Sequence, residues 1–121
     1  MNEVKVVEKP WGKEQWLGLT DRYCFKKITL NKGYLTSLQY HNFKHETTYI
    51  DSGRAIFHWH DEEGMLHKKE VGPGFSVMLA PGQVHRFEAL EDLVMFEAST
   101  PEVHDVIRLE DSYNREGTSN P

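Results

Sequence analysis

Three absences limit what this chain of 121 residues can be. It has a single cysteine, Cys24, so no disulfide can form within the chain, which agrees with a reducing compartment. No apolar run approaches the roughly 20 residues that a membrane-spanning helix needs. The segment from Met1 to Lys5 also lacks the apolar core of a secretory signal. We therefore expect a cytoplasmic protein that does not enter a membrane.

An excess of basic residues is also missing. Lysine and arginine number 14 against 19 aspartates and glutamates, which gives a formal net charge of -5, and the two signs are interleaved. Nucleic-acid grooves and surfaces that bind anionic membranes favour a basic patch. The composition therefore disfavours both partners and favours a small molecule, and an anionic ligand would have to be held by a few local cations.

Turn-forming residues divide the chain into short apolar or alternating segments. Nine strands are expected, over residues 15–19, 23–30, 36–41, 47–51, 55–60, 66–71, 75–79, 85–89 and 93–99. This pattern predicts an all-β protein, and the strand spacing suits a double-stranded β-helix, a jelly-roll barrel with a central cavity. The length fits one domain, with a barrel core over about 13–100, an N-terminal arm over 1–12 and a C-terminal extension over 101–121.

The segment from Gly33 to Gly53 has the spacing of a metal-binding β-hairpin. Gln39 and His41 project to the same side of an extended strand, because side chains alternate between its two faces. A turn just after His41 can bring Glu46 back toward them. An amide oxygen, an imidazole and a carboxylate can therefore meet at one point.

A fourth donor follows later in the chain. His85 comes just after the tight turn at Pro81-Gly82, which can feed a strand into the same cavity. We therefore predict a metal site made by Gln39, His41, Glu46 and His85. This mix of one amide oxygen, one carboxylate and two imidazoles suits a borderline divalent ion, zinc first, with manganese, iron, cobalt or nickel as alternatives.

Each donor alone has a simpler explanation. Gln39 can be satisfied by neighbouring strands, Glu46 can be a surface carboxylate, and the histidines can be ordinary hydrogen-bonding residues. Only the combined spacing favours a metal, and the alternative is a protein in which these residues hydrogen-bond a small molecule without one. His58 and His60 also share a strand face, but no glutamate follows at hairpin spacing. We expect that pair on the solvent side or at an interface.

The two histidine segments resemble the two signature motifs of the cupin superfamily, and the resemblance covers most of the chain. The first reads Ser37-Leu38-Gln39-Tyr40-His41, which is similar to the Ser-Leu-Gln-x-His of the cupin domain of type II mannose-6-phosphate isomerases. The second appears as Gly74, then Ala80-Pro81-Gly82, then His85, with Ala89 where the usual motif has asparagine. Other pieces agree in order, namely Lys9-Pro10-Trp11-Gly12, Lys26-Lys27-Ile28, Val106-Ile107-Arg108-Leu109-Glu110-Asp111 and Tyr113-Asn114-Arg115.

This resemblance implies an activity and residues that carry it. Type II mannose-6-phosphate isomerases interconvert an aldose phosphate and a ketose phosphate at a metal. The reaction needs a Lewis acid for the sugar carbonyl and a group that moves a proton between C1 and C2. Lys26 and Glu97 match the family's positions for that proton transfer, and both lie in otherwise apolar runs. Their alternatives are to point outward or to pair with each other.

Substrate binding needs cations near the cavity mouth and allows aromatic stacking. Arg86, next to a predicted ligand, and Arg108, in the matched C-terminal stretch, are the candidate cations, with Arg115 as a weaker third. Strict alternation places Arg86 on the face opposite His85, unless a bulge intervenes. Tyr49 is a candidate for stacking on a sugar ring.

The sequence therefore predicts a metal-dependent cupin that isomerises or epimerises a sugar or sugar phosphate. The alternative is a non-catalytic cupin that binds or senses a small sugar-like ligand. Cupins commonly pair, so the resemblance also implies a homodimer, with the segment from Val4 to Trp11 as a candidate exchanged arm.

Overall fold

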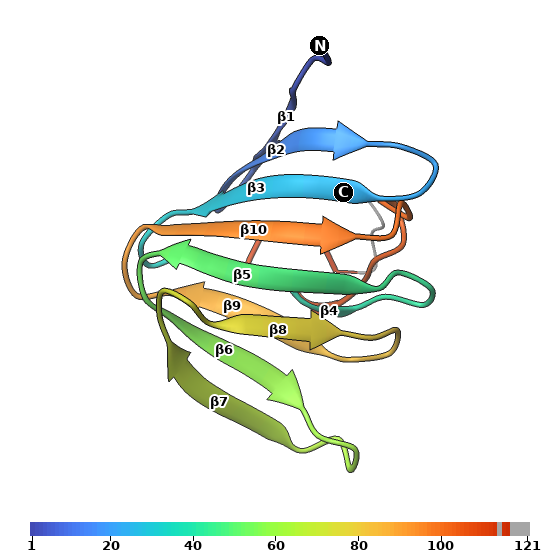
Figure 1. Ribbon diagram of the computed structural model, residues 1–121. Helices are drawn as coiled ribbons and strands as arrows, with labels where there is room; N and C mark the ends of the chain where they lie inside the picture. Colours follow the sequence, from blue (N-terminus) through green and yellow to red (C-terminus); the bar gives the residue numbers. More distant parts are fainter. Residues whose placement is uncertain (114, 117–121) are drawn as a thin grey trace.

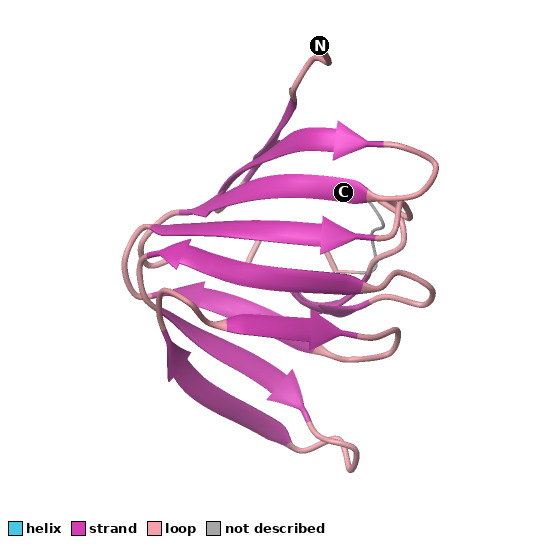
Figure 2. Cartoon of the chain, in the orientation of Figure 1, coloured by secondary structure: helices cyan, strands magenta, loops and turns pink. Residues whose placement is uncertain are grey.

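The computed structural model describes residues 1–113, 115 and 116 of the chain. Among these residues, eleven strands form two antiparallel sheets that face each other, and the connections are turns and loops without a helix (Figure 1, Figure 2). The all-β prediction is confirmed. None of the described residues belongs to a helix with the length and apolar character that crossing a membrane requires.

The larger sheet has six strands. Their order is β1 (Lys5–Lys9), β2 (Gly12–Leu19), β3 (Cys24–Leu30), β10 (Leu93–Ser99), β5 (Glu46–Ser52) and β8 (Ser76–Leu79). The smaller sheet has five strands, in the order β11 (Ile107–Glu110), β4 (Leu38–Tyr40), β9 (His85–Ala89), β6 (Ala55–His60) and β7 (Leu66–Val71). Because strands that follow each other in sequence often lie in opposite sheets, the chain winds between the layers, as a jelly roll does.

The interior is apolar toward one end of the strands and polar toward the other. Along β10, Leu93 and Met95 face the core, and Glu97, two residues later on the same face, is buried among charged groups. The apolar core consists of Trp11, Ile28, Leu30, Ile50, Ala55, Phe57, Val71, Leu79, Phe87, Ala89, Leu93 and Met95. Burial of these side chains stabilises the sandwich and leaves the polar end free to carry a site.

The nine expected strands correspond to β2 through β10. The two further strands, β1 and β11, lie in the ranges expected as an arm and an extension. β1 pairs with β2 of the same chain, from Lys5 opposite Trp16 to Lys9 opposite Gly12. The structure contains one chain, so the homodimer stays a prediction.

The turn between β5 and β6 brings two backbones into close contact. Gly53 has a φ of 90°, which is the left-handed region that favours glycine. A Cβ atom at this position would lie 2.3 Å from the carbonyl oxygen of Asp92. Only glycine fits this crossing without a shift of the backbone.

Candidate metal centre

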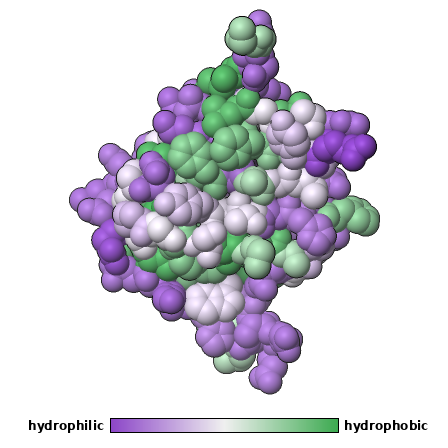
Figure 3. All heavy atoms as spheres, viewed as in Figure 1, coloured by the Kyte–Doolittle hydropathy of each residue, from purple (hydrophilic) through white to green (hydrophobic). Residues whose placement is uncertain are grey.

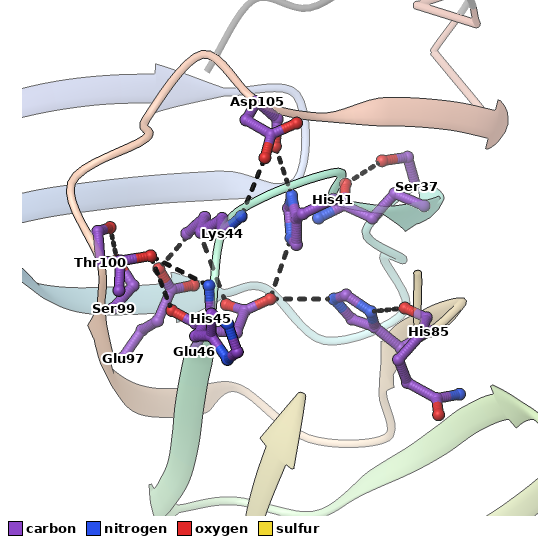
Figure 4. A network of polar contacts seen from close by, with 12 residues as sticks. Ser37, His41, Lys44, His45, Glu46, His85, Glu97, Ser99, Thr100 and Asp105 are labelled. Atoms are coloured by element: carbon purple, nitrogen blue, oxygen red, sulfur yellow. Dashed lines mark hydrogen bonds and ion pairs between the residues drawn. The ribbon is translucent and has the colours of Figure 1, made fainter. Parts of the chain in front are cut away.

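Two histidines and one glutamate meet at the polar end of the sandwich. His41 follows β4, Glu46 is the first residue of β5, and His85 is the first residue of β9. All three are buried, and one potential ligand atom from each lies within 4.8 Å of the others. Figure 4 shows the two imidazole rings directed at the glutamate carboxylate. The tight loop after β4 and the turn before β9 therefore bring these residues together as the sequence predicts.

The hydrogen bonds of this cluster favour a cation at its centre. The Nε2 atoms of His41 and His85 lie 3.0 and 3.2 Å from the same carboxylate oxygen, Oε1 of Glu46. Each ring also contacts a backbone carbonyl through Nδ1, that of Asp105 for His41 and that of Gln83 for His85. A carbonyl only accepts, so each Nδ1 carries hydrogen, and a neutral ring then presents the lone pair of Nε2. The two Nε2 atoms and the Glu46 carboxylate oxygen are all electron-pair donors, and they face one another. A proton or a metal ion must therefore lie between them.

A pair of buried carboxylates adjoins the histidines. Burial would raise the pKa of Glu46, but Lys44 and the hydrogen bonds from both histidines hold that pKa well below its usual range. Burial and the neighbouring charge of Glu46 raise the pKa of Glu97. Burial would lower the pKa of His85, but its hydrogen bond to Glu46 raises it. Glu46 is therefore the anionic member of the pair and the suitable metal ligand.

Lys44 links the two carboxylates from the loop before β5. Its Nζ atom lies 3.0 Å from Oε2 of Glu97 and 3.9 Å from Oε2 of Glu46. Lys44 is buried, and despite burial these two glutamates raise its pKa above the usual range of a lysine. The side chain is a permanent cation that fixes the carboxylates.

Asp105 holds the loop that carries His41. Its carboxylate accepts hydrogen bonds from the backbone N–H groups of Asn42, Phe43 and Lys44, at 3.0, 2.6 and 2.9 Å. Burial would raise the pKa of Asp105, but these three hydrogen bonds lower it. Asp105, from the C-terminal part of the chain, thus orients both the ring of His41 and the backbone of the loop that follows it, residues 42–44.

The predicted amide ligand lies beside the cluster. Gln39 pairs with His85 across β4 and β9 and lines the same cavity. Its side-chain oxygen accepts a hydrogen bond from the hydroxyl of Ser37. Coordination by Gln39 therefore stays a prediction, whereas His41, Glu46 and His85 form a complete three-residue cluster.

Both predicted proton-transfer residues face the cavity. Lys26 and Glu97 are buried and line it, and they lie 4.0 Å apart, Nζ to Oε2. The shorter contact of Lys26 is with Glu14, at 3.2 Å. Lys26 also lies 4.9 Å from the ring centroid of Trp16. The two residues point inward and also approach each other, so their roles in catalysis stay a prediction.

Of the predicted substrate-binding residues, Arg108 faces the cavity and two others do not. Arg108 is opposite Gln39 in the ladder, is buried and lines the cavity. Arg86 follows strict alternation onto the outer face, where Nε donates to the carbonyl of Thr36. Tyr49 is 44% exposed on the outer face of β5. A substrate in the cavity would not reach either side chain, so both assignments are wrong for this site.

Apolar groups gather on that outer face of the larger sheet. Tyr49 lies opposite Phe96 in the ladder, and Phe96 stacks on Phe25 with ring centroids 5.9 Å apart. The space-filling view shows patches of hydrophobic atoms on this side between hydrophilic ones (Figure 3). Tyr49 therefore belongs to a surface cluster of aromatic residues.

The second histidine pair also lies outside the cavity. His58 and His60 alternate with Phe57 and Trp59, which pack in or against the core. His58 is buried on the outer face of the smaller sheet, with Nε2 3.2 Å from Oε1 of Glu88. His58 is therefore not exposed to solvent as one alternative expected, and the other alternative, a position at an interface, stays a prediction.

The cavity around the cluster is small and strongly charged. Its volume is about 80 Å³, below the roughly 300 to 1,000 Å³ of typical small-molecule pockets. Five cations and four carboxylates line it, namely Lys9, Lys26, Lys44, Arg108, Arg115, Glu14, Glu46, Glu97 and Asp105. A ligand of the size of a hexose can therefore enter only when side chains at the mouth move aside.

Four of these charged residues were missed in the sequence: Lys9, Glu14, Lys44 and Asp105. The sequence did indicate an inward position for Glu14, because Glu14 shares a strand face with Trp16 and a large aromatic side chain usually points inward. No such indication exists for the other three, since a lysine at a strand end or loop and an aspartate in a loop are usually exposed.

Comparisons with solved structures identify the fold as that of a cupin. The chain superposes on the capsular polysaccharide assembling protein CapF from Staphylococcus aureus with a TM-score of 0.76 and 17% identity, covering 92% of this chain and 35% of that one. It superposes on oxalate decarboxylase from Bacillus subtilis with a TM-score of 0.75 and 19% identity, covering 88% of this chain and 30% of that one. At these identities the likeness shows the fold alone.

Sequence comparison gives the family. The model described as mannose-6-phosphate isomerase C-terminal matches residues 1–111. The mannose-1-phosphate guanylyltransferase ManC of Salmonella typhimurium is 30% identical over 114 residues, which are 90% of this chain and 23% of that protein. The xanthan biosynthesis protein XanB of Xanthomonas campestris is 29% identical over 114 residues, with the same coverage of 90% and 23%. This chain belongs to the mannose-6-phosphate isomerase C-terminal family, and it spans less than a quarter of the length of these curated relatives.

Proposed function

We propose that this cupin domain binds one divalent metal through His41, Glu46 and His85 and acts on a sugar or sugar phosphate as an aldose-ketose isomerase or an epimerase. The convergence of the two Nε2 atoms on one carboxylate oxygen carries this proposal. Two imidazoles and a carboxylate with an open coordination position are typical of a catalytic centre for zinc or a similar ion.

A bound metal would polarise the carbonyl of an open-chain sugar and stabilise the enediolate. The protein's own part in this reaction falls to the two groups that line the same cavity, Lys26 and Glu97. Both have reach to a ligand held beside the cluster and both carry exchangeable protons, which a transfer between C1 and C2 needs. Lys44 holds Glu97 in place at 3.0 Å.

The cavity volume favours a second candidate function. At about 80 Å³, the cavity is small for a sugar phosphate, so such a substrate would have to displace side chains at the mouth. The same structure suits a domain that binds a small sugar-like ligand without turnover, because such a domain does not have to accommodate a reaction. The family match and the names of the relatives support a sugar-phosphate ligand for either function.

Hydrogen exchange separates the two functions. Protein loaded with one equivalent of zinc or manganese is incubated with aldose and ketose phosphates in deuterated water, and NMR follows exchange at C2. The isomerase proposal predicts exchange that is lost in Glu97→Gln, while that variant keeps its metal. His45→Ala is the matched control, because His45 is exposed in the same loop as the predicted ligands.

The metal role is read from the same panel. His41→Ala should lose both bound metal and exchange, whereas His45→Ala keeps both. Ligands that raise the unfolding temperature without any exchange would favour the binding function instead. Stoichiometric metal binding by His41→Ala would refute the assignment of the centre.

A further inference from the structure

The outer face of the larger sheet has an apolar centre. β3, β10 and β5 lie side by side there, and no segment of the described chain crosses in front of them (Figure 1). Phe96, in the middle strand, is opposite Tyr49 in the ladder and stacks on Phe25. Tyr49 and Phe25 are exposed. Exposed aromatic side chains are typical of the centre of a protein interface, where burial removes them from water.

A hollow of about 560 Å³ adjoins these rings on one side of β10. Thr47, Ala98 and Met78 line it, and they are neighbours across β10, β5 and β8. Thr47 and Ala98 have small side chains, and Met78 is 85% exposed. Phe25 lies on the other side of β10, opposite Ala98 in the ladder. The face therefore has a large ring on one side of its middle strand and a hollow on the other.

The charges of this face also differ between the two sides of β10. Lys27 lies on β3, opposite Phe96 in the ladder. Asp51 lies on β5, two residues after Tyr49, and is exposed. Neither Lys27 nor Asp51 forms an ion pair with another of the described residues. A cation on one side and an anion on the other can pair when the face meets a second copy of itself.

A two-fold axis parallel to β10 brings these features together. With the axis between two facing copies, β3 of one copy lies over β5 of the other, because the rotation exchanges the two sides of β10. Phe25 of one copy then lies over Thr47 and the hollow of the other. Lys27 lies over Tyr49, next to Asp51, and each contact occurs twice. Two sheets that pack face to face are about 10 Å apart, a distance that long side chains fill.

We propose that the outer face of the larger sheet binds a second copy of this chain as a two-fold dimer, in which Phe96 packs on Phe96 and Lys27 pairs with Asp51 of the other copy. This dimer requires neither a metal nor turnover. It also leaves β1 paired with β2 of its own chain, so no arm is exchanged.

Sedimentation velocity over a wide range of protein concentration measures the association of the purified chain. Phe96→Asp would bury a charge against its own copy, so we expect dimerisation about a hundredfold weaker or more. Met78→Asp, at an exposed position that the fold of a single copy does not need, should weaken it at least about tenfold. Leu66→Asp, exposed on β7 of the other sheet, is the matched control and should dimerise like the wild type. A thermal melt confirms that each variant is folded.

Charge reversal tests the pairing of Lys27 with Asp51. Lys27→Glu and Asp51→Lys each place like charges together twice in the dimer, so either change alone should weaken dimerisation about tenfold. The double variant restores an opposite pair and should recover most of this loss. Losses that add in the double variant would show that the two side chains do not meet.

A crosslink locates the axis. Residues on the outer face of β10 lie close to it, so Ala98→Cys brings two thiols to about the separation of the sheets, roughly 10 Å, which a short bismaleimide spans. Cys24 is buried and does not compete. We expect crosslinked dimers for Ala98→Cys and none for Leu66→Cys. A chain that stays monomeric at every concentration would overturn the proposal. A dimer that Phe96→Asp and Met78→Asp leave unchanged would also overturn it and would place the association elsewhere, such as at an exchanged N-terminal arm.

Discussion

Replacing Lys9 by methionine should stabilise this protein, although it removes a buried ion pair. Methionine keeps the length and apolar stem of lysine without its charge. The folded pKa of Lys9 is about 8, against 10.5 for the free side chain. At about 1.4 kcal/mol for each tenfold change, that difference makes charged Lys9 unfavourable by at most about 3 kcal/mol. The side chain is only 4% exposed, so little of this cost is screened by solvent.

The pH dependence of the free energy of unfolding shows whether the charge on Lys9 is unfavourable in the folded state. Below pH 8, Lys9 is protonated in both the folded and the unfolded states, and the folded state bears the full cost. Between pH 8 and 10.5 the folded state releases the proton first, the unfolded state binds more protons, and the stability of the wild type rises with pH. Lys9→Met lacks this rise. Its advantage in free energy of unfolding should be about 2 to 3 kcal/mol at pH 7 and should fall by about 2 kcal/mol by about pH 9.5.

Urea unfolding of both proteins at the two pH values measures this difference, and groups that titrate alike in both cancel from it. Lys13→Met, on the strand that pairs with β1, is the matched control. A Lys9→Met variant that is less stable at pH 7, or an advantage that is constant with pH, would mean that Glu14 compensates Lys9 fully.

Two further predictions concern the frame of the site. Asp105→Ala leaves three backbone N–H groups of the loop after His41 without their acceptor, so we expect a loss of about 1 to 3 kcal/mol in the free energy of unfolding by urea and weaker zinc binding in a competition titration. Because the folded pKa of Asp105 is lowered, the stability advantage of the wild type should shrink as the pH falls below about 4. An advantage that persists in acid would contradict this. Gly53→Ala would place a Cβ 2.3 Å from the Asp92 carbonyl oxygen and should lower the free energy of unfolding by roughly 2 kcal/mol or more. Gly64→Ala, at a φ of 81° in open space, should lower it by less. Equal melting temperatures for the two variants would show that the close contact is unimportant.

Alternation and turn residues were sufficient to predict most of the fold. A strand that buries one face shows a period of two in sequence. β3, β9 and β10 carry that signal clearly, whereas β7 buries only its last residue. β11 reads Ile107-Arg108-Leu109, and the same rule would bury the two apolar residues. The structure does the reverse, with Arg108 inside and Leu109 44% exposed. A charged interior cancels the hydrophobic signal at the strands that line it.

The same reason limits prediction of the site. His41, Glu46 and His85 were accessible because fixed spacing within a hairpin and after a turn positions them locally. Lys9 and Asp105 reach the cavity through long-range packing of the chain ends, which no local period encodes. Arg86 was assigned because it is next to a predicted ligand in sequence, and Tyr49 because an aromatic ring could stack on a sugar, but alternation placed both on the outer face. Sequence patterns locate the three residues of the candidate metal cluster, but not the charged residues around the rest of the cavity.

The charged residues of the cavity come from two different parts of the chain. The candidate metal ligands come from β5, β9 and the loop after β4, whereas Lys9, Arg108 and Arg115 come from the edge strands β1 and β11 and the segment after β11. Asp105 joins the two parts, because it precedes β11 and also binds the loop that carries His41. A change in the position of Asp105 would therefore also change the geometry of the candidate metal cluster.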